Sequence, residues 1–463
     1  MMTINNPILP TKQVFAKKAG APKSLHSEAI CIFIATGFFM DDDTYWHDMT
    51  CLLPAHKHIL DSHNILLKST PTFNWHYSPR TIDFDTVLQE YVALFSQITK
   101  EQIGNSKVIL PLSGGLDSRS QALILKGLGN PVHAYSYSFQ NGFREDEIAK
   151  RIAKNCGFKF NAFTIESGYL WDVVEDLAEI NGCFSEFTHP RQMAILPELK
   201  KMDGIFSLGH WGDVLFDRGV AEGIQESEVI PYLLKKIIKP KGFKLAELLW
   251  QEWQLEGDFK SFLIARIEAS ISKIKIDNIS AKVRAFKTSQ WAHRWTTTNL
   301  SVFEAAHPIS LPYYDARMCE FICTIPEEYL ADRRLQIAHL KQDKQLANIT
   351  WQDQRPFSLN TYQYNKIPYN LPFRILSKAK RIKQELLGNP YIQRNWELQF
   401  QGADNAKNLE SYLFDFSFNQ WIPRSIINEM YLDYKNNDSV NGAHAISMLL
   451  TLSLWHKKHS NDF

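Results

Sequence analysis

PLSGGLDSRS, residues Pro111 to Ser120, is the stretch of this sequence that narrows the fold most. It follows KVILPL, an apolar run that predicts a buried strand, and it leads into SRSQALILKGLG, which predicts a helix ended by glycines. Gly114 and Gly115 let the backbone approach an anion closely, and the amides at the start of the helix point towards it. The stretch therefore predicts a phosphate-binding loop between a strand and a helix.

An acidic residue, Asp117, lies inside this predicted phosphate cradle, and Ser113 and Ser118 add hydroxyl groups. A carboxylate beside a phosphate implies a cation between them, and Mg²⁺ is usually held by one or two carboxylates plus substrate phosphates. We therefore expect a Mg²⁺–phosphate site here, with Asp117 as a metal ligand. No Lys follows the glycines, so this is not a GxxxxGK[ST] loop.

Strand and helix patterns alternate from Lys107 to Gly209. Further strands are expected at 133–139, 160–165 and 204–209, and helices at 146–157, 169–180 and 190–202. This rhythm predicts an α/β fold, a doubly wound parallel sheet with helices on both faces. Helical periodicity begins at Phe84, and after Val220 the strand signals fade into helical patterns. We expect one domain over 84–463, with an α/β core at 84–220 and a helical extension at 221–463.

Residues 1–83 differ from the rest of the chain in their pattern of polar and apolar residues. The stretch to Ser27 is polar, and Pro7, Pro10 and Pro22 discourage regular structure there. Residues 28–77 contain short β-like runs, and HILDSHNILLKS (58–69) predicts two strands around a polar turn. We expect a small β-rich segment.

Composition excludes several classes of protein. Lys and Arg number 51 against 50 Asp and Glu, which argues against a nucleic-acid binder working by bulk charge. The six cysteines are scattered without a CxxC pair, so neither a zinc–thiolate site nor a disulfide framework is expected. The most apolar run, Ala29–Met40, is shorter than the roughly 20 residues that a membrane-spanning helix needs.

The N-terminus has no apolar signal-peptide core, so we expect a cytoplasmic protein without membrane contact. The basic runs KPKGFK (239–244) and KAKRIKQ (378–384) are interpreted as solvated faces.

SGGLDS in this setting resembles the pyrophosphate loop of enzymes that split ATP into AMP and pyrophosphate. Four further stretches, in matching order, resemble the asparagine synthetase family: FREDEIAKRIAKNCGF, SLGHWGDVLFDRG (207–219), LPYYDARMCEFICTIPEEY (311–329) and the closing SMLLTLSLW. The resemblance runs from Phe84 to the C-terminus. Trp211 stands where the family has a glycine.

The resemblance implies a reaction. A substrate carboxylate, on a small molecule or a peptide, attacks the α-phosphate of ATP to give an acyl-adenylate and pyrophosphate, and ammonia or an amine then displaces AMP. It also implies that Asp213, just after a strand end, joins Asp117 in holding Mg²⁺. Leu112, Gly209 and the backbone of 135–137 would border the nucleoside, beside the loop residues Ser113, Gly114, Gly115 and Ser118.

One departure from the family concerns the amine. The family's glutaminase half uses an N-terminal cysteine, whereas this chain begins Met1-Met2-Thr3 and has no cysteine before Cys31. Residues 28–77 resemble only the end of that half, about 100 to 150 residues being absent upstream. We therefore expect no glutamine hydrolysis by this chain, and ammonia or an amine, free or delivered by a partner protein.

Two further departures concern catalytic side chains. His210 stands where glutamine-using relatives carry a Glu thought to act on the amine; it is either a base or a residue packed beside the phosphates. The family places a catalytic Lys in a later loop, here LANITWQDQRPFS (346–358). Asp353 and Gln354 occupy that position, so Arg355 either supplies the cation, belongs only to the loop structure, or marks a lost step.

Two other functions remain open at this point. The chain is an amide-forming ligase that uses an amine of its own substrate, as β-lactam synthetases and lasso-peptide cyclases do, or a nucleotide-binding pseudoenzyme subunit. Arg334, Lys341 and Lys344 share one helical stretch and form either a solvated face or a phosphate contact.

Overall fold

The structure, a computed structural model, describes residues 1–351, 355–388 and 390–460. A five-stranded parallel sheet organises it, in the order β10-β9-β6-β7-β8. The strands are β6 (Val108–Pro111), β7 (Val132–Phe139), β8 (Lys159–Ile165), β9 (Ile205–Ser207) and β10 (Ile309–Ser310). The first four confirm the strands expected from the sequence; the two-residue β10 lies in a region where only helices were expected.

Helices cover both faces of this sheet. The crossovers contain α3 (Leu116–Leu128), α4 (Glu145–Cys156), α5 (Tyr169–Asn181) and α6 (Leu196–Lys200), and α2 (Phe84–Ile103) precedes the first strand. Neighbouring residues of β6 enter different cores: Val108 and Leu110 pack in one hydrophobic cluster and Ile109 in another. Because side chains alternate along a strand, this division means that β6 is buried on both faces. The expected doubly wound α/β fold is confirmed.

The order of the strands reverses at β6. The chain runs outward from β6 through β7 to β8, then returns to the other side of β6 as β9 and β10. Open α/β sheets bind their ligands at the carboxyl ends of the strands beside such a switch point. The loops that follow β6 and β9 are therefore the expected place for a site.

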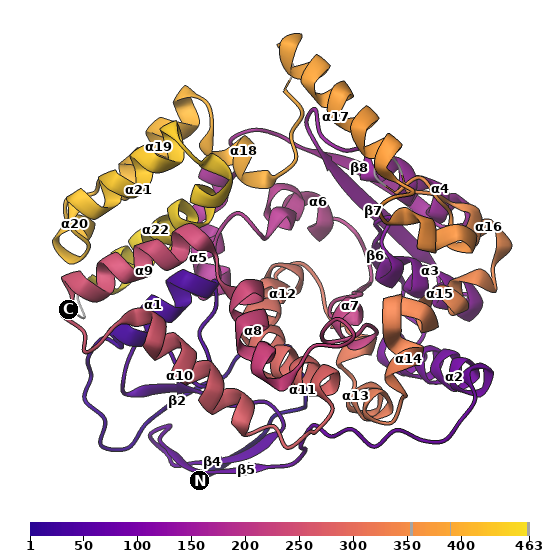
Figure 1. The fold of residues 1–463 in the computed structure, drawn as a ribbon, viewed down its shortest axis with the longest axis horizontal. Coiled ribbons are helices and arrows are strands. Elements are labelled where there is room, and N and C mark those ends of the chain that lie inside the picture. The colour runs from indigo at the N-terminus through magenta and orange to yellow at the C-terminus, as the bar shows by residue number, and fades with distance from the viewer. Residues whose placement is uncertain (352–354, 389, 461–463) are drawn as a thin grey trace.

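Helices form the rest of the chain (Figure 1). The elements after β9 are α7 (Gly212–Leu215), α8 (Val229–Ile237), α9 (Pro240–Glu252), α10 (Phe259–Ser272), α11 (Ile279–Lys287), the π-helix η3 (Thr288–Thr296), α12 (Thr297–Glu304), α13 (Ala316–Cys323), α14 (Glu327–Leu330), α15 (Arg334–Lys341), α16 (Lys344–Asn348), α17 (Leu371–Leu386), α18 (Asn395–Phe400), α19 (Ala403–Leu413), α20 (Phe418–Trp421), α21 (Arg424–Asn436) and α22 (Ser439–His459). Helices α9, α19, α21 and α22 gather in a lobe beside the sheet.

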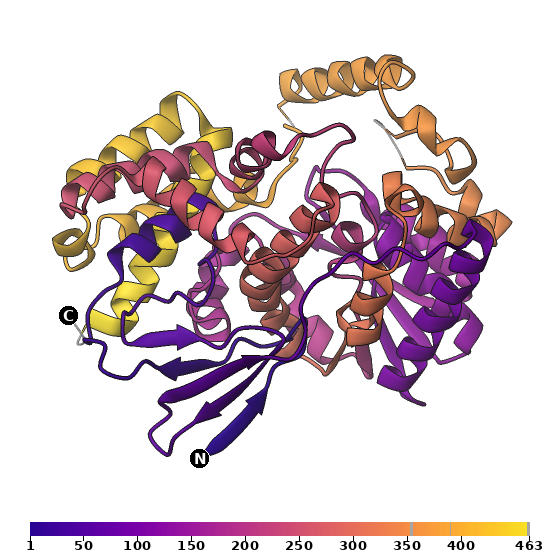
Figure 2. The same ribbon diagram turned by 60° about the horizontal axis from the view of Figure 1, so that its bottom comes forward.

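The N-terminal strands lie together at one end of the molecule, as Figure 2 shows. β1 (Met2–Asn5), β4 (His56–Leu60) and β5 (Leu66–Pro71) form an antiparallel sheet, and β2 (Phe15–Lys17) pairs with β3 (Met49–Cys51). The β4–β5 hairpin confirms the expected pair of strands. The irregular structure expected before Ser27 is wrong in part, because β1 and β2 pair with strands much later in the segment.

The structure also corrects the β-like structure expected for the apolar run after Ser27. This run forms a helix, α1 (Ser27–Thr36), and not a strand. Every residue from Ala29 to Thr36 is buried. An element buried on all sides has no periodicity that separates helix from strand. α1 shares a hydrophobic core with α5, α9 and α22, far from it in sequence. The division at residue 83 stays a prediction.

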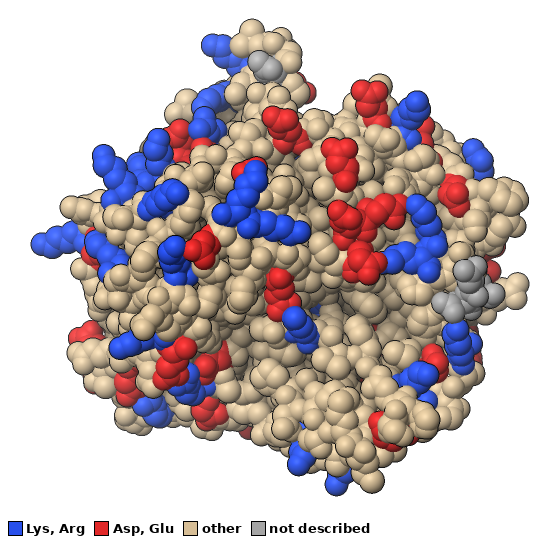
Figure 3. All heavy atoms as spheres, turned by 180° about the vertical axis from the view of Figure 1, so that it is seen from behind, with Lys and Arg blue, Asp and Glu red and all other residues tan. Residues whose placement is uncertain are grey.

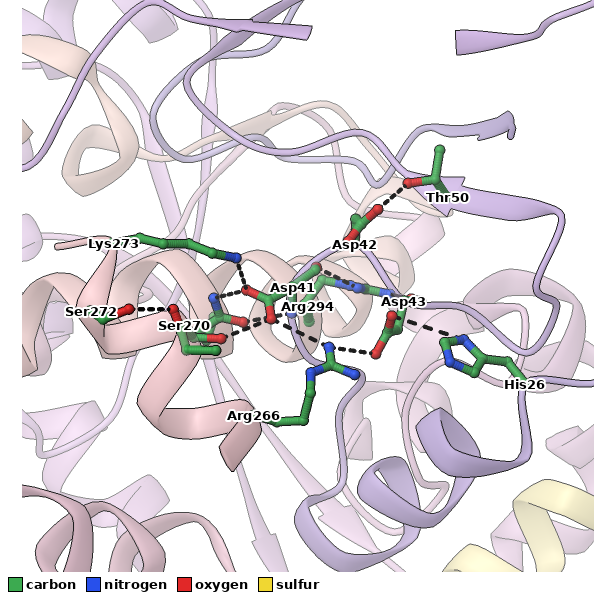
Figure 4. Close-up of polar contacts among 12 residues, drawn as sticks. His26, Asp41, Asp42, Asp43, Thr50, Arg266, Ser270, Ser272, Lys273 and Arg294 are labelled. Carbon is green, nitrogen blue, oxygen red and sulfur yellow. Dashed lines mark hydrogen bonds and ion pairs between the residues drawn. The ribbon is translucent and has the colours of Figure 1, made fainter. Parts of the chain in front are cut away.

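A polar network fixes the segment that follows α1 (Figure 4). Arg266 donates to the carboxylates of Asp43 (2.8 Å) and Asp41 (3.3 Å). Arg294 donates to the backbone carbonyls of Asp41 (2.8 Å) and Asp43 (2.7 Å). Two arginines from the helical region thus hold this N-terminal segment in place.

All six cysteines are buried and unbridged, as expected. Among residues 1–351, 355–388 and 390–460, no helix is long and apolar enough to span a bilayer.

Candidate active site

The loop between β6 and α3 forms a closed cradle of hydrogen bonds. The amide of Ser113 donates to the hydroxyl of Ser118 (3.1 Å), and the amide of Gly115 donates to the hydroxyl of Ser113 (3.1 Å). The amide of Gly114 donates to a carboxylate oxygen of Glu145 at 3.2 Å. An anionic oxygen therefore already lies on one amide of this loop, which is the interaction that a phosphate oxygen would make.

Arg119 supports the loop from behind. It is fully buried and donates to the carbonyl of Gly114 (3.0 Å) and to the carbonyls of Leu346 (3.3 Å) and Ile349 (3.0 Å). Its guanidinium stacks 4.6 Å from the ring of Trp351, and a side chain at Gly114 would meet that ring at 3.1 Å. Burial lowers the pKa of Arg119 to about 10. The sequence analysis did not single out Arg119 or Trp351.

Asp117 lies in the first turn of α3 and receives two side chains from the region of α15. The guanidinium of Arg333 donates to its carboxylate and forms an ion pair with it. The amide of Gln336 donates to the same carboxylate at 2.8 Å. Burial raises the pKa of Asp117 to about 6; Arg333 opposes this rise and the nearby Asp213 adds to it.

Two glycines after β9 keep the space around Asp117 open. A Cβ atom at Gly209 would lie 3.1 Å from the Cβ of Asp117, and one at Gly212 would overlap its carboxylate. Asp213 follows at once and lines the same cavity as Asp117. The structure thus brings together the acidic pair expected from the sequence.

Trp211 stands where the family pattern has a glycine, and its backbone conformation is one that favours glycine. Its φ is +73°, in the left-handed region that favours glycine. Its indole N–H donates to the hydroxyl of Thr288 at 3.1 Å, which anchors the strained turn.

These side chains open into a cavity of about 640 Å³ at the carboxyl ends of β6 and β9. Most of the residues expected to bind nucleotide line it: Leu112, Ser113, Gly115, Asp117, Ser118, Gly209, His210, Asp213 and the segment 135–137. Gly114 lies behind this wall, between Arg119 and Glu145.

His210 lines the cavity with its Nδ1 atom buried and without a hydrogen-bond partner among the described residues. Its ring meets Phe303 edge to face at 5.5 Å. Burial lowers the pKa of His210 to about 4, so the imidazole is neutral near pH 7. A neutral imidazole can accept a proton or a hydrogen bond from a ligand.

Lys287, at the end of α11, is a cation of the cavity wall that sequence reasoning missed. It donates to the carbonyl of Gly219 at 2.8 Å. Burial lowers its pKa to about 8, with Lys236 and Arg284 acting in the same direction and Asp217 and Asp213 opposing. Its helical surroundings resemble those of many surface lysines, so the sequence offered no signal for it.

Arg355, the cation expected from the sequence, is exposed and is not among the residues that line the cavity. Its neighbours Asp353 and Gln354 lie outside the described residues. Arg334 stacks on Phe84, 4.2 Å from the ring centre, and is not among the residues that line the cavity. Lys341 and Lys344 are exposed.

The residues of the cavity fit MgATP. Asp117 and Asp213 supply the oxygen ligands that Mg²⁺ prefers. The loop amides and the start of α3 suit phosphate. Both amide atoms of Gln121 are buried without a partner among the described residues, and its Oε1 lies 3.3 Å from where a Gly209 side chain would begin, behind the cavity wall.

A parallel sheet with this order, and a glycine-rich loop at its switch point, define an α/β protein that binds its ligand at the carboxyl ends of the strands. Within that class the chain belongs to the asparagine synthase family, whose model matches residues 93–457. Membership in this family makes it an ATP-using, ligase-type enzyme.

Solved structures with similarity to part of the chain include an NMN synthetase from Francisella tularensis and an NH3-dependent NAD synthetase from Campylobacter jejuni. The first is 16% identical, with a TM-score of 0.23, covering 46% of this chain and 93% of the other. The second is 16% identical, with a TM-score of 0.22, covering 42% and 95%. No curated protein matches the chain.

Proposed function

We propose that this chain forms an amide bond in two steps. In the first, a substrate carboxylate attacks the α-phosphorus of ATP; a P–O bond forms and the bond to pyrophosphate breaks, giving an acyl-adenylate. In the second, ammonia or an amine attacks the acyl carbon, loses a proton and displaces AMP. The alternative in which the amine belongs to the substrate itself uses the same first step.

The cradle residues hold the nucleotide in this proposal. Ser113, Gly115 and Ser118 contact the pyrophosphate, and Asp117 and Asp213 hold Mg²⁺. When bound, Mg²⁺ neutralises negative charge between the carboxylates and the phosphates. The protein's main contribution is positioning and preorganised charge, as in other phosphate chemistry.

Cations and a neutral imidazole lie at the cavity. Lys287 supplies a positive charge on its wall, and Arg333 supplies one beside Asp117. His210 presents an unpartnered nitrogen that can take the proton released when the amine attacks. These three side chains give the cavity what an acyl transfer to an amine requires.

The nitrogen donor is proposed to reach the site as free ammonia or as an amine. It is not proposed to come from glutamine hydrolysed by this chain. A cysteine nucleophile works as an accessible thiolate. The first cysteine, Cys31, is fully buried in α1, and burial strongly raises the pKa of its thiol.

The meeting of Asp117 and Asp213 at the phosphate cradle carries the proposal. Its test is ATP–pyrophosphate exchange by the full chain, with a panel of small carboxylic acids and peptides, followed by addition of ammonia or amines. We expect exchange that depends on a carboxylate and an amide product when the amine is added.

Asp117→Asn should abolish exchange, whereas Asp172→Asn, an exposed change on α5, should not. Exchange at the wild-type rate in Asp117→Asn would overturn the metal role of Asp117. ATP binding without exchange for any carboxylate would support the pseudoenzyme alternative, and glutamate formed from glutamine by the purified chain would refute the proposed amine source.

A further inference from the structure

Helix α17 projects from the body of the molecule. Figures 1 and 2 both show it extending beyond the neighbouring elements, on the side of the sheet. Ser377 is its only buried residue. A helix of this length normally buries an apolar stripe, so its arrangement needs a reason.

The apolar face of α17 points away from the protein. Leu371, Ile375, Ala379, Ile382 and Leu386 recur at spacings of three and four, which places them on one face, and all are exposed. Ile375 is 60% exposed and Leu386 is 82% exposed.

The opposite face lies nearer the body and is mostly polar, with Phe373 as its apolar contact, packed on Phe357 at 5.7 Å. Ser377, Arg381 and Gln384 share this face and are the least exposed residues of the helix. The usual arrangement of a surface helix, with apolar residues inward and polar residues outward, is therefore reversed.

The apolar surface continues into the segment before α17. Ile367 and Tyr369 are exposed, and Tyr369 packs on Tyr364 with ring centres 4.9 Å apart. Of the sixteen large apolar side chains exposed in the described part of the chain, ten lie between residues 364 and 387. Such a concentration marks an interaction surface.

The same segment is strongly basic. Figure 3 shows Lys and Arg side chains gathered along the projection at its upper left, where α17 is seen from behind. Residues 364–387 contain six cations and one anion, a net charge of +5, whereas the whole chain has +1, so the remainder carries −4. The six cations are Lys366, Arg374, Lys378, Lys380, Arg381 and Lys383.

We propose that α17 binds the surface of a membrane that contains anionic lipids. An outward apolar face flanked by Lys and Arg is the pattern of a helix that lies in the membrane interface. The apolar side chains enter the acyl boundary, and the long basic side chains reach the negative headgroups. This proposal replaces both the interpretation of 378–384 as a solvated face and the expectation of no membrane contact, and it extends beyond the proposed ligase activity.

Vesicle flotation with the full chain tests the proposal. The probes are vesicles of phosphatidylcholine alone and vesicles with about a third phosphatidylglycerol. We expect flotation with the anionic vesicles and little with the neutral ones, weakening as salt rises from 50 to 500 mM because salt screens the headgroup charge. Absence of binding to the anionic vesicles at low salt would overturn the proposal.

Two variants separate this surface from non-specific adhesion. Ile375→Ser with Leu386→Ser should reduce flotation at least tenfold, whereas Phe416→Ser, an equally exposed change on another part of the molecule, should not. Changing Lys378, Lys380 and Lys383 to Gln should lower the partition on the order of a hundredfold. The matched control changes Lys235, Lys260 and Lys407, exposed lysines outside the segment, to Gln.

Equal loss in the α17 variants and the controls would refute the assignment to α17. An exposed apolar helix face could also be covered by a second copy of the chain. The mass of the protein in solution, measured by light scattering, tests this alternative. A dimer that Leu386→Ser converts to a monomer, without an effect on flotation, would show that a second copy covers the helix and would overturn the membrane proposal. Folding of each variant is checked by its thermal transition.

Discussion

The guanidinium of Arg333 forms an ion pair with the carboxylate of Asp117, in the first turn of α3. The pair joins residues that lie 216 positions apart in the sequence. Arg333 has a φ of +62°, in the left-handed region, and this conformation turns the chain at the start of α15. The carboxylate assigned to Mg²⁺ is therefore held between a cation and the second carboxylate, Asp213.

Replacing Asp117 with Asn should stabilise the metal-free protein at neutral pH. The pKa of Asp117 rises from its ordinary value of 3.8 to about 6 on folding, because burial disfavours the charge. The folded chain therefore binds the extra proton between these two pH values, and stability falls as pH rises through that window. The full shift corresponds to about 3 kcal/mol, so we expect a gain of about 2–3 kcal/mol for Asp117→Asn above pH 6.5.

Urea unfolding in EDTA measures this effect. The gain of Asp117→Asn over the wild type should be present at pH 7.5 and should vanish near pH 4, where the wild-type carboxyl is also neutral. A difference that is the same at both pH values would show that charge burial is not its cause.

Arg119→Met should weaken both the fold and the nucleotide site. Three buried backbone carbonyls lose their donor, and each unsatisfied buried group costs about 1–3 kcal/mol. We expect a loss of about 2–4 kcal/mol in unfolding free energy and a raised KM for ATP, because the Gly114 carbonyl is no longer anchored. Arg151→Met is the control: Arg151 is exposed and donates to one carbonyl, that of Thr350, so the loss should stay below about 1 kcal/mol. Equal losses in the two variants would contradict the supporting role of Arg119.

Gly212→Ala should abolish pyrophosphate exchange without unfolding the chain. The added methyl group would overlap the Asp117 carboxylate and also approach the ring of Tyr313. Displacing a group that positions charge at the phosphate typically costs a hundred- to a thousand-fold in rate. Gly127→Ala is the matched control, because nothing lies within 4 Å of its added methyl group. Exchange by Gly212→Ala within threefold of the wild type would show that the space around Asp117 is not needed.

Local sequence was enough to predict the half of the site that lies on adjacent elements. The strand–glycine–helix succession placed the loop, and the rule that ligands bind at strand ends placed Asp213 beside Asp117. Both inferences depend on the geometry of neighbouring elements, which the positions of glycines and strands in the sequence predict.

The other half depends on packing between distant elements. Arg334 was singled out in place of Arg333, yet Arg334 stacks on Phe84 while its neighbour reaches Asp117. Two consecutive residues in the left-handed region, Asp332 and Arg333, set the turn before α15, and helical periodicity does not report it. The error at α1 has a different cause. This helix is buried on all sides, so its sequence shows no periodicity that separates a helix from a strand.

Lys287, and not Arg355, should supply the cation for the first chemical step. The transition state of adenylation gathers negative charge at the phosphate, and a preorganised cation stabilises it. Lys287 lines the cavity near Asp213, whereas Arg355 is exposed and does not line it. We expect Lys287→Gln to slow pyrophosphate exchange a hundred- to a thousand-fold, Arg355→Ala to stay within about threefold of the wild type, and Lys235→Gln, an exposed change, to have no effect.

The dependence of exchange on pH distinguishes the two cations further. The pKa of Lys287 is lowered to about 8, so its charge is lost as pH rises through that value and the wild-type rate should fall above it. An Arg keeps its charge throughout this range. Lys287→Arg should therefore move the alkaline decline to higher pH, whereas Arg355→Lys should leave it in place. A wild-type rate that stays constant to pH 10, together with a large loss in Arg355→Ala, would return the role to Arg355.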